Sequence, residues 1–389
     1  MAHSRAGITI IGAGISGLSL GRVLSKRGVP YAIFERDSIE TAKKRHRYGI
    51  TLEPKAYQPL LRYLNSDESI FRERLAVDGA LKRSGVGGRP FRAKRQRLEA
   101  LLSRDLNIKY DHKLESHSRT KGITILTFTN GQEVSSSLTV GADGVHSDLR
   151  TAIGIQAELK TIPYAVYRGK KLIIASEDRR AYDLLTEAVR QDGNVLQHRQ
   201  GSAIFQIQVD DLTTTAADLT YTYSRSARRT SEDPLFKPHR PKSGARDLPP
   251  ELFHEIAALN SGLKGIFAEI FDAEKMRKDR VINWLMRSIS VEISELLSAA
   301  EGKGMVFLGD AVHAMPILGS YGANAGIEDA IALGEAIPDD GDYTKLDIPA
   351  FVRERSDLWR KLVGDGEQRL ASMHTAQPPA QSEDSRSNL

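Results

Sequence analysis

Three glycines near the start of the chain have the spacing of a dinucleotide-binding turn. Gly12, Gly14 and Gly17 form a Gly-x-Gly-x-x-Gly pattern, and Glu35 follows about twenty residues later. The first glycine permits a tight turn, the second lets backbone N–H groups approach a diphosphate, and the third allows a helix to pack closely on its strand. Glu35 would accept hydrogen bonds from ribose hydroxyls. The pattern predicts a dinucleotide site, because a plain glycine turn would leave the position of Glu35 unexplained.

The elements around this turn support the same interpretation. Residues 8–11 are a β-branched apolar run, which is typical of a parallel strand buried on both faces. A helical apolar pattern over 18–24 follows and stops at Gly28, and residues 31–34 form the next strand, which ends at Glu35. The segment therefore predicts a βαβ unit. Its apolar start is interpreted as a buried strand, not as a signal sequence.

Two further turns place an aspartate directly after a predicted buried strand. Strand 138–141 leads into Asp143-Gly144, and strand 305–308 leads into Gly309-Asp310. The second turn is followed by Gly322-Ala323-Asn324 and a predicted helix over 325–337. Since the carboxyl ends of parallel strands carry the ligand-binding turns of α/β folds, both turns are candidates for the same site as Gly12.

These motifs, in this order, are highly specific, and over residues 7–340 the chain resembles the class A, aromatic-hydroxylase type, family of FAD-dependent monooxygenases. The resemblance implies an α/β fold of the glutathione reductase type. In it a Rossmann-type FAD-binding domain with a parallel sheet is interrupted by an α+β substrate domain with a mixed or antiparallel sheet. Many fungal members of the family act in secondary metabolism.

The resemblance also implies roles for individual residues. Asp143-Gly144 would contact FAD and help to form the nicotinamide path, and Asp310 would contact the ribitol and diphosphate. Pro316 and residues 322–324 would lie against the isoalloxazine, and Arg95 would meet the phosphates from the far side. The expected cofactor-binding set is Gly12, Gly14, Ser16, Gly17, Glu35, Arg36, Arg47, Arg95, Asp143, Gly144, Gly309, Asp310, Pro316, Gly322, Ala323 and Asn324.

The loop beside the flavin departs from the family pattern at one position. Ser320 stands where the family has a glycine, with Gly319 just before it. The sequence therefore leaves the conformation of this loop undetermined, while flavin binding is still expected. Asn324 is interpreted as the N-cap of the following helix. The positive end of that helix would then face the pyrimidine edge of the flavin, where reduction places negative charge.

Arg168, Pro316 and Tyr321 are the candidates for contact with the reacting groups. Arg168 would orient the substrate, and Tyr321 is interpreted either as a residue that closes over the flavin or substrate or as a surface tyrosine. Arg47 is interpreted either as a contact to flavin or NADPH or as a solvated loop arginine. The histidines inside the two acidic motifs, His146 and His313, are expected to be structural, and no metal site is expected.

Composition limits the remaining classes of function. The absence of cysteine excludes disulfides and a cysteinyl flavin link, so FAD would be bound non-covalently, and it suits a reducing, cytoplasmic location. The net charge of +5 comes without a long basic cluster, so no nucleic-acid partner is expected. No apolar run approaches the roughly 20 residues that a membrane span requires.

The expected organisation is a divided FAD-binding domain, 1–160 and 301–345, around a substrate or lid domain, 161–300, followed by a C-terminal helix, 346–375, and a disordered tail, 376–389. NADPH or NADH would reduce FAD, and O2 would form the flavin C4a-hydroperoxide that transfers one oxygen atom to a small aromatic or secondary-metabolite substrate. A reductase or halogenase of the same fold is the alternative, and an interaction module that keeps FAD as structure is a third possibility. Substrate identity, the choice among hydroxylation, epoxidation and Baeyer–Villiger insertion, and oligomeric state remain open.

Overall fold

The computed structural model of the chain describes residues 7–79, 87–228, 233–318, 321–338, 342 and 345–375. The expected tail, 376–389, and the two loop positions Gly319 and Ser320 lie outside these residues. None of the helices within the described residues combines the length and the apolarity that a membrane crossing requires.

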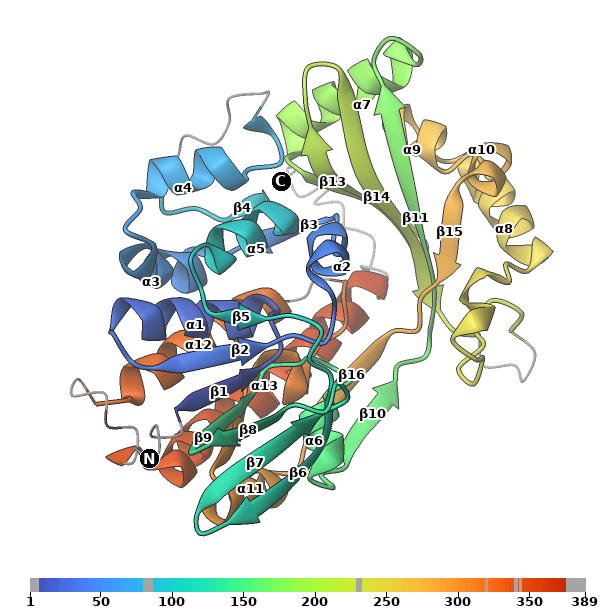
Figure 1. The fold of residues 1–389 in the computed structure, drawn as a ribbon. Coiled ribbons are helices and arrows are strands. Elements are labelled where there is room, and N and C mark those ends of the chain that lie inside the picture. Colours follow the sequence, from blue (N-terminus) through green and yellow to red (C-terminus); the bar gives the residue numbers. More distant parts are fainter. Residues whose placement is uncertain are drawn as a thin grey trace, which may run out of the picture.

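A five-stranded parallel sheet forms the first layer of the molecule (Figure 1). Its order is β17 (Met305–Phe307), β9 (Leu138–Gly141), β1 (Ile8–Ile11), β2 (Tyr31–Phe34) and β5 (Ile108–Lys109). All four strand pairs are parallel, and every residue of β1, β9 and β17 is buried, as a sheet covered on both faces requires. The fold class expected from the sequence, a parallel sheet in a mixed α/β protein, is confirmed.

Helices and a small meander surround this sheet. Helices α1 (Ile15–Lys26) and α12 (Gly322–Ala336) pack against each other, and α3 (Pro54–Leu64) lies next to α12. An antiparallel meander is formed by β6 (Leu114–Thr120), β7 (Ile123–Phe128) and β8 (Glu133–Ser136). Helix α5 (Arg95–Ser103) packs against α1.

The middle of the chain forms a second, antiparallel five-stranded sheet. Its order is β12 (Val195–Gln200), β13 (Ala203–Leu212), β14 (Ala216–Ser226), β11 (Tyr164–Ile174) and β15 (Arg280–Asn283). Helices α8 (Pro250–Asn260), α9 (Gly265–Ile270) and α10 (Ala273–Lys278) lie on its outer side, on the right of Figure 1. Helix α7 (Arg179–Asp192) packs against β11 and β12. This sheet has its own hydrophobic core, which is separate from the core around β1 and α1.

Three short elements join the two cores. Strands β10 (Ala157–Thr161), β16 (Arg287–Val291) and β18 (His313–Ala314) form a small antiparallel sheet. Helix α11 (Ile293–Lys303) buries Leu296, Ala299 and Ala300 in the first core. It begins before residue 300, where the inserted domain was expected to end. We therefore propose that the inserted unit ends before β16.

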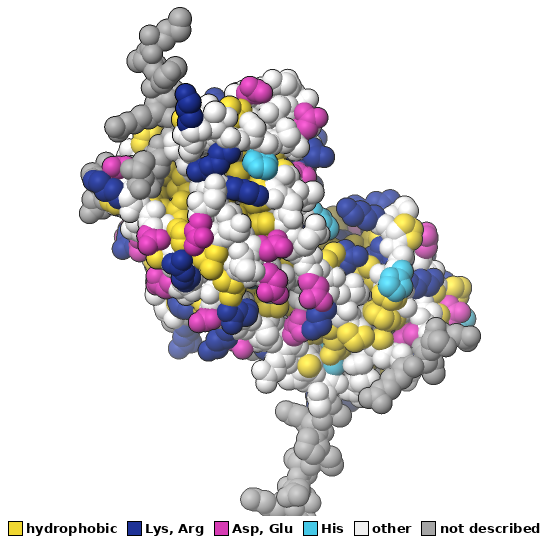
Figure 2. Space-filling view, turned by 90° about the horizontal axis from the view of Figure 1, so that it is seen from below, with side chains coloured by type: hydrophobic (Ala, Val, Ile, Leu, Met, Phe, Trp, Pro, Cys, Tyr) yellow, Lys and Arg dark blue, Asp and Glu magenta, His cyan; other side chains and the backbone are white. Residues whose placement is uncertain are grey.

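A long C-terminal helix, α13 (Ile348–His374), covers the first core and reaches the five-stranded antiparallel sheet. Its buried residues recur at helical spacing, as expected for an amphipathic helix that covers a core. Phe351 and Trp359 belong to the first core, whereas Leu370 packs with Val166 of β11. On the face shown in Figure 2, basic and acidic side chains are interspersed over the molecule.

Asp210 is a buried polar link between the antiparallel sheet and the two-stranded antiparallel sheet formed by β3 (Gly49–Leu52) and β4 (Phe91–Lys94). It lies at a bulge in β13 and is 1% exposed. Its carboxylate accepts from Gly49 N at 2.7 Å and lies 2.8 Å from Lys170 Nζ and 3.4 Å from the Arg92 guanidinium. Burial lowers the pKa of Arg92 to about 10, and the charge of Asp210 opposes that shift. Asp210 therefore stabilises a buried cation as well as the junction.

We predict that Asp210→Asn lowers the free energy of unfolding by about 3 kcal/mol or more, because it leaves the buried Arg92 without a countercharge. The matched control is Asp183→Asn, since Asp183 is 54% exposed and pairs with Arg179 on α7. The control should change stability by less than about 1 kcal/mol. Urea unfolding of both variants measures the difference, and equal losses would contradict this role of Asp210.

Candidate cofactor site

A cavity of about 470 Å³ opens at the carboxyl ends of the parallel strands. Segments from many parts of the chain line it, because the turns after β1, β2, β9 and β17 all end at this edge of the sheet. The predicted cofactor residues that line this cavity are Gly12, Gly14, Glu35, Arg36, Arg95, Asp143, Gly144 and Asp310. The structure thus brings together residues that are up to about three hundred positions apart in the sequence.

The turn between β1 and α1 leaves no room for a side chain at Gly12 or Gly17. Gly12 has φ +104°, and a Cβ on it would lie 2.5 Å from the carbonyl oxygen of Ala142. A Cβ on Gly17 would lie 2.0 Å from the carbonyl oxygen of Gly12. Helix α1 begins after Gly14 with no side-chain cap and no acidic residue in its first turn. Its first N–H groups therefore offer an anion site at the cavity wall.

Ser16 connects the glycine turn to the second aspartate turn instead of lining the cavity. Its Oγ lies so close to Gly309 and Gly326 that a Cβ on either glycine would be 2.3 or 2.4 Å from it. The seryl side chain therefore fixes the distance between α1 and the start of α12.

Glu35 is 3% exposed and already accepts several hydrogen bonds. Ala13 N donates at 2.8 Å, Asp37 N at 3.1 Å, and the Arg45 guanidinium at 3.0 and 3.1 Å. Burial alone would raise the pKa of Glu35, but Arg45 and the two backbone donors outweigh it and hold the pKa below its usual value. The carboxylate is therefore ionised and fixed in orientation at the end of β2.

Arg45, not Arg47, is the arginine of this segment that lines the cavity. Arg45 also contacts Asp37 at 2.6 Å and the carbonyl oxygen of Ala13 at 3.0 Å. Arg47 is exposed, and its backbone oxygen accepts a hydrogen bond from Lys170. The two arginines stand two positions apart, so the motif alone did not distinguish them.

Arg95 lines the cavity at the start of α5, where it is held by two partners. Its Nε donates to Glu99 at 2.9 Å, and its guanidinium donates to the hydroxyl of Tyr48 and lies 5.4 Å from the centre of that ring. Tyr48 and His46 also line the cavity, and His46 Nδ1 lies 3.2 Å from Glu99. Sequence reasoning did not include Tyr48, His46 or Glu99 in the site, because no motif contains them.

Asp143 has one carboxylate oxygen with a partner and one without. Oδ2 accepts from Leu149 N at 3.0 Å, at the start of α6 (Asp148–Ala152), whereas Oδ1 is buried and accepts no hydrogen bond from any described residue. Buried acceptors are nearly always paired in native proteins, so an unpaired one on a residue that lines the cavity indicates a ligand donor. Burial raises the pKa of Asp143, and the hydrogen bonds from Ser147 and Leu149 oppose it.

Asp310 is exposed on the cavity wall, within the short 3-10 turn Gly309–Ala311. The preceding amide, Gly309 N, donates to Asp329 at 3.0 Å. Gly322 is adjacent, since a Cβ on it would lie 3.5 Å from Asp310 Oδ1. The start of α12 therefore lies beside the second aspartate, as the order of the motifs suggested.

The expectation that Asn324 caps α12 is wrong. The helix begins at Gly322, after Tyr321, so Asn324 lies inside the first turn. Its side chain is 2% exposed, accepts from Glu53 N at 2.9 Å and donates to the Thr51 carbonyl at 3.0 Å. These two hydrogen bonds fix the end of β3, and a residue engaged in this way cannot also bond the amides of its own helix.

The three residues expected near the reacting groups do not line the cavity. Pro316 is buried against α13 at Gly366, and the Tyr321 hydroxyl donates to Glu328, about two turns further along α12. Arg168 lies on β11, where its guanidinium stacks between the rings of Tyr48 at 5.5 Å and Trp284 at 5.6 Å. Tyr48 does line the cavity, so Arg168 lies directly behind a residue of the cavity wall.

Comparison with known proteins agrees with this geometry. A family model described as FAD binding domain matches residues 290–339. The FAD-dependent monooxygenase adaC of Aspergillus niger is 31% identical over 398 residues, covering 94% of this chain and 93% of that protein.

Solved structures share the fold. The 2,6-dihydroxypyridine-3-hydroxylase of Arthrobacter nicotinovorans superposes with a TM-score of 0.70 at 14% identity, covering 98% of both chains. HpxO of Klebsiella pneumoniae, solved with FAD and uric acid, has a TM-score of 0.65 at 18% identity and covers 95% of this chain and 89% of its own. With this fold, and with a curated relative matched over nearly its whole length, the chain belongs to the family of FAD-dependent monooxygenases.

Proposed function

We propose that this chain is an NAD(P)H-dependent monooxygenase that binds FAD non-covalently and adds one oxygen atom to a small aromatic substrate. The balanced reaction for a hydroxylation is RH + O2 + NAD(P)H + H⁺ → ROH + NAD(P)⁺ + H2O. The observation that carries the proposal is the single cavity where Gly12, Glu35, Asp143 and Asp310 meet. When bound, FAD would accept hydride from the nicotinamide and activate O2 for transfer to the substrate.

The cavity residues fit the parts of FAD. The uncapped start of α1 suits the diphosphate, and Glu35 suits the hydroxyls of the adenosine ribose. The free Oδ1 of Asp143 is an acceptor for a hydroxyl or N–H donor, and Asp310 would accept from the ribitol. A carboxylate beside a diphosphate is repulsive unless it accepts from a donor, so both aspartates are assigned to hydroxyl or N–H groups. Helix α12 would direct its positive end toward the flavin ring.

Three cationic side chains around His146, those of Arg36, Lys242 and Arg287, support a nicotinamide dinucleotide as the reductant. Arg36 and His146 line the cavity, and the charges of Lys242 and Arg287 act on His146. Burial and these cations lower the pKa of His146. The Nε of Arg287 is buried and has no hydrogen-bond partner among the described residues. This concentration of positive charge favours the binding of an anionic ligand such as NAD(P)H.

Arg168 supports a planar substrate with an acidic oxygen. The guanidinium lies between two aromatic rings, and no hydrogen bond or ion pair joins it to another residue in the described part of the chain. Burial lowers the pKa of Arg168, and the charges of Asp210 and Tyr48 oppose this shift. Trp284 packs against the apolar cluster that contains Leu318, just before the flavin-side loop. A half-buried cation with open donors at this position would bind a phenolate, enolate or carboxylate.

The function is tested by mixing the FAD-loaded protein anaerobically with NADPH or NADH, and then with 18O2 and a panel of hydroxylated aromatic compounds. The pyridine nucleotide should bleach the yellow flavin, and mass spectrometry should find a product that carries one 18O atom. Bleaching followed by re-oxidation to hydrogen peroxide, with no labelled product from any compound, would favour a non-oxygenating oxidoreductase instead.

The role of Arg168 is tested with 2-naphthol and its methyl ether, which differ in one ionisable hydroxyl. We expect the wild type to bind the naphthol more tightly, and Arg168→Met to lose about tenfold or more of that affinity while its affinity for the ether changes little. Arg168→Lys should retain part of the preference, because it keeps the charge. Titrations followed by flavin absorbance give the affinity of each of the three proteins for each compound, and an unchanged preference in Arg168→Met would refute the assignment.

A further inference from the structure

Asp329 of α12 is a fully buried carboxylate that links two distant parts of the chain. It is 0% exposed, and each of its oxygens accepts two hydrogen bonds. Burial alone would raise the pKa of Asp329, but His313, Arg355 and Trp359 outweigh it and hold the pKa well below its usual value. The carboxylate is therefore an anion whose orientation is fixed by its donors.

One oxygen of Asp329 holds the second aspartate turn. Oδ2 accepts from Gly309 N at 3.0 Å and lies 2.6 Å from His313 Nε2. These two donors stand immediately before and three residues after Asp310. The Asp310 side chain itself has no hydrogen bond to any described residue, so the backbone on either side of it sets its direction into the cavity.

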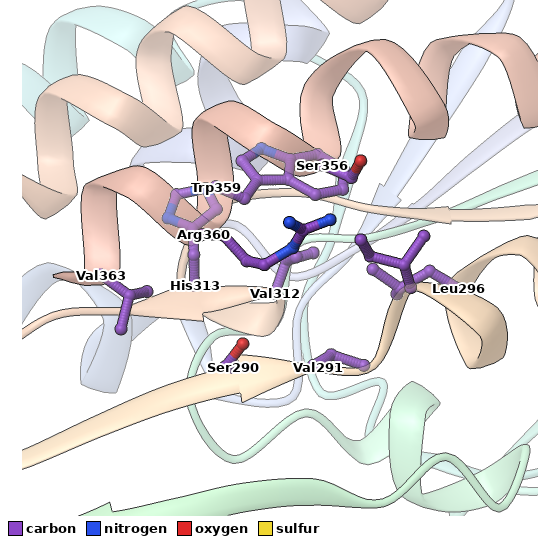
Figure 3. Close-up of a pocket in the computed structure, with 10 residues that line it drawn as sticks. Ser290, Val291, Leu296, Val312, His313, Ser356, Trp359, Arg360 and Val363 are labelled. Atoms are coloured by element: carbon purple, nitrogen blue, oxygen red, sulfur yellow. The ribbon is translucent and has the colours of Figure 1, made fainter.

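The other oxygen of Asp329 is held by α13. Oδ1 accepts from Trp359 Nε1 at 2.9 Å and from the Arg355 guanidinium at 2.5 Å. The Trp359 indole also stacks on the His313 imidazole, with ring centres 6.0 Å apart and planes at 29°. Figure 3 shows the two rings side by side, Trp359 projecting from the helix and His313 from the strand below it. Helix α13 lies outside the matched FAD-binding segment, which ends at residue 339.

The same helix also contacts the substrate side of the molecule. Glu367 lies 2.6 Å from Ser288 Oγ and 2.6 Å from Lys160 Nζ. Near the end of the helix, the Nε2 of the buried His374 lies 2.9 Å from Ser224 Oγ of β14. Because α13 is one continuous helix, a displacement at either end would be transmitted to Asp329.

We propose that Arg355 and Trp359 are positioning residues for the cofactor, which act through Asp329 to hold Asp310 against FAD. The proposal rests on the proposed function, in which Asp310 contacts FAD. Removing the indole N–H leaves Asp329 Oδ1 with one donor fewer, which loosens the carboxylate and with it Gly309 and His313. The first consequence is weaker FAD binding, before any effect on oxygen transfer.

A double-mutant cycle distinguishes positioning from general stability. Trp359→Phe, Asp310→Asn and the double variant are purified, stripped of FAD and titrated with FAD by fluorescence quenching. We expect each single change to raise the FAD dissociation constant about tenfold, the loss of one charge-assisted hydrogen bond. The double variant should be no weaker than Asp310→Asn alone, because the two residues act through the same contact.

Controls separate the possible failures. Arg353→Gln, on the exposed side of α13 where Arg353 pairs with Glu301 at 3.3 Å, should leave the dissociation constant unchanged. Arg355→Gln repeats the test if Trp359→Phe lowers the melting temperature of the FAD-free protein. Multiplying effects in the double variant, or unchanged FAD affinity in the Trp359→Phe and Arg355→Gln variants, would overturn the positioning role. Absence of FAD binding by the wild type would instead overturn the proposed function.

Discussion

The adjacency of four parallel strands determines where the candidate site lies. The sheet order β17-β9-β1-β2 places the residues after each strand in one row at the carboxyl edge: Asp310, Asp143, Gly12 and Glu35. The row needs close backbone contact, since a Cβ on Gly12 would meet the Ala142 carbonyl at 2.5 Å. Every other feature of the site, including the uncapped start of α1 and the free oxygen of Asp143, depends on this row.

The antiparallel sheet and helix α13 stabilise the positions of these four residues at the edge of the parallel sheet. The five-stranded antiparallel sheet reaches the cavity through Asp210, which accepts a hydrogen bond from Gly49 N at the start of β3, directly after Tyr48. Helix α13 reaches it through Asp329, which bonds Gly309. Both links are buried carboxylates that accept from a backbone amide and from basic side chains. Such contacts favour one arrangement of the backbone, because a shifted amide would leave a buried charge with fewer partners.

The local part of this arrangement could be predicted from the sequence. Strand–turn–helix patterns identified four of the five strands of the parallel sheet and the fold class, because burial on both faces produces continuous apolar runs. The motif residues Gly12, Glu35, Asp143 and Asp310 do meet at one cavity. Their contacts to FAD remain a proposal.

The long-range part could not be predicted. Asn324 looked like a helix cap by position, yet its amide bonds Thr51 and Glu53 more than two hundred and fifty residues earlier. Asp329 belongs to none of the motifs, and its partners come from the second aspartate turn and from α13. Arg45 and Arg47 lie in the same loop, and only the folded structure shows that Arg45 is the one whose side chain contacts Glu35. These facts depend on tertiary contacts that no local pattern encodes.

The most direct test of the account is a titration of FAD-free protein with FAD, for the wild type and for Gly12→Ala. The wild type should bind one FAD per chain and become yellow. Gly12→Ala should show no saturable binding, because its Cβ would collide with the neighbouring strand end. A wild type that stays colourless with excess FAD, or a Gly12→Ala variant that binds FAD as well as the wild type does, would contradict the central claim.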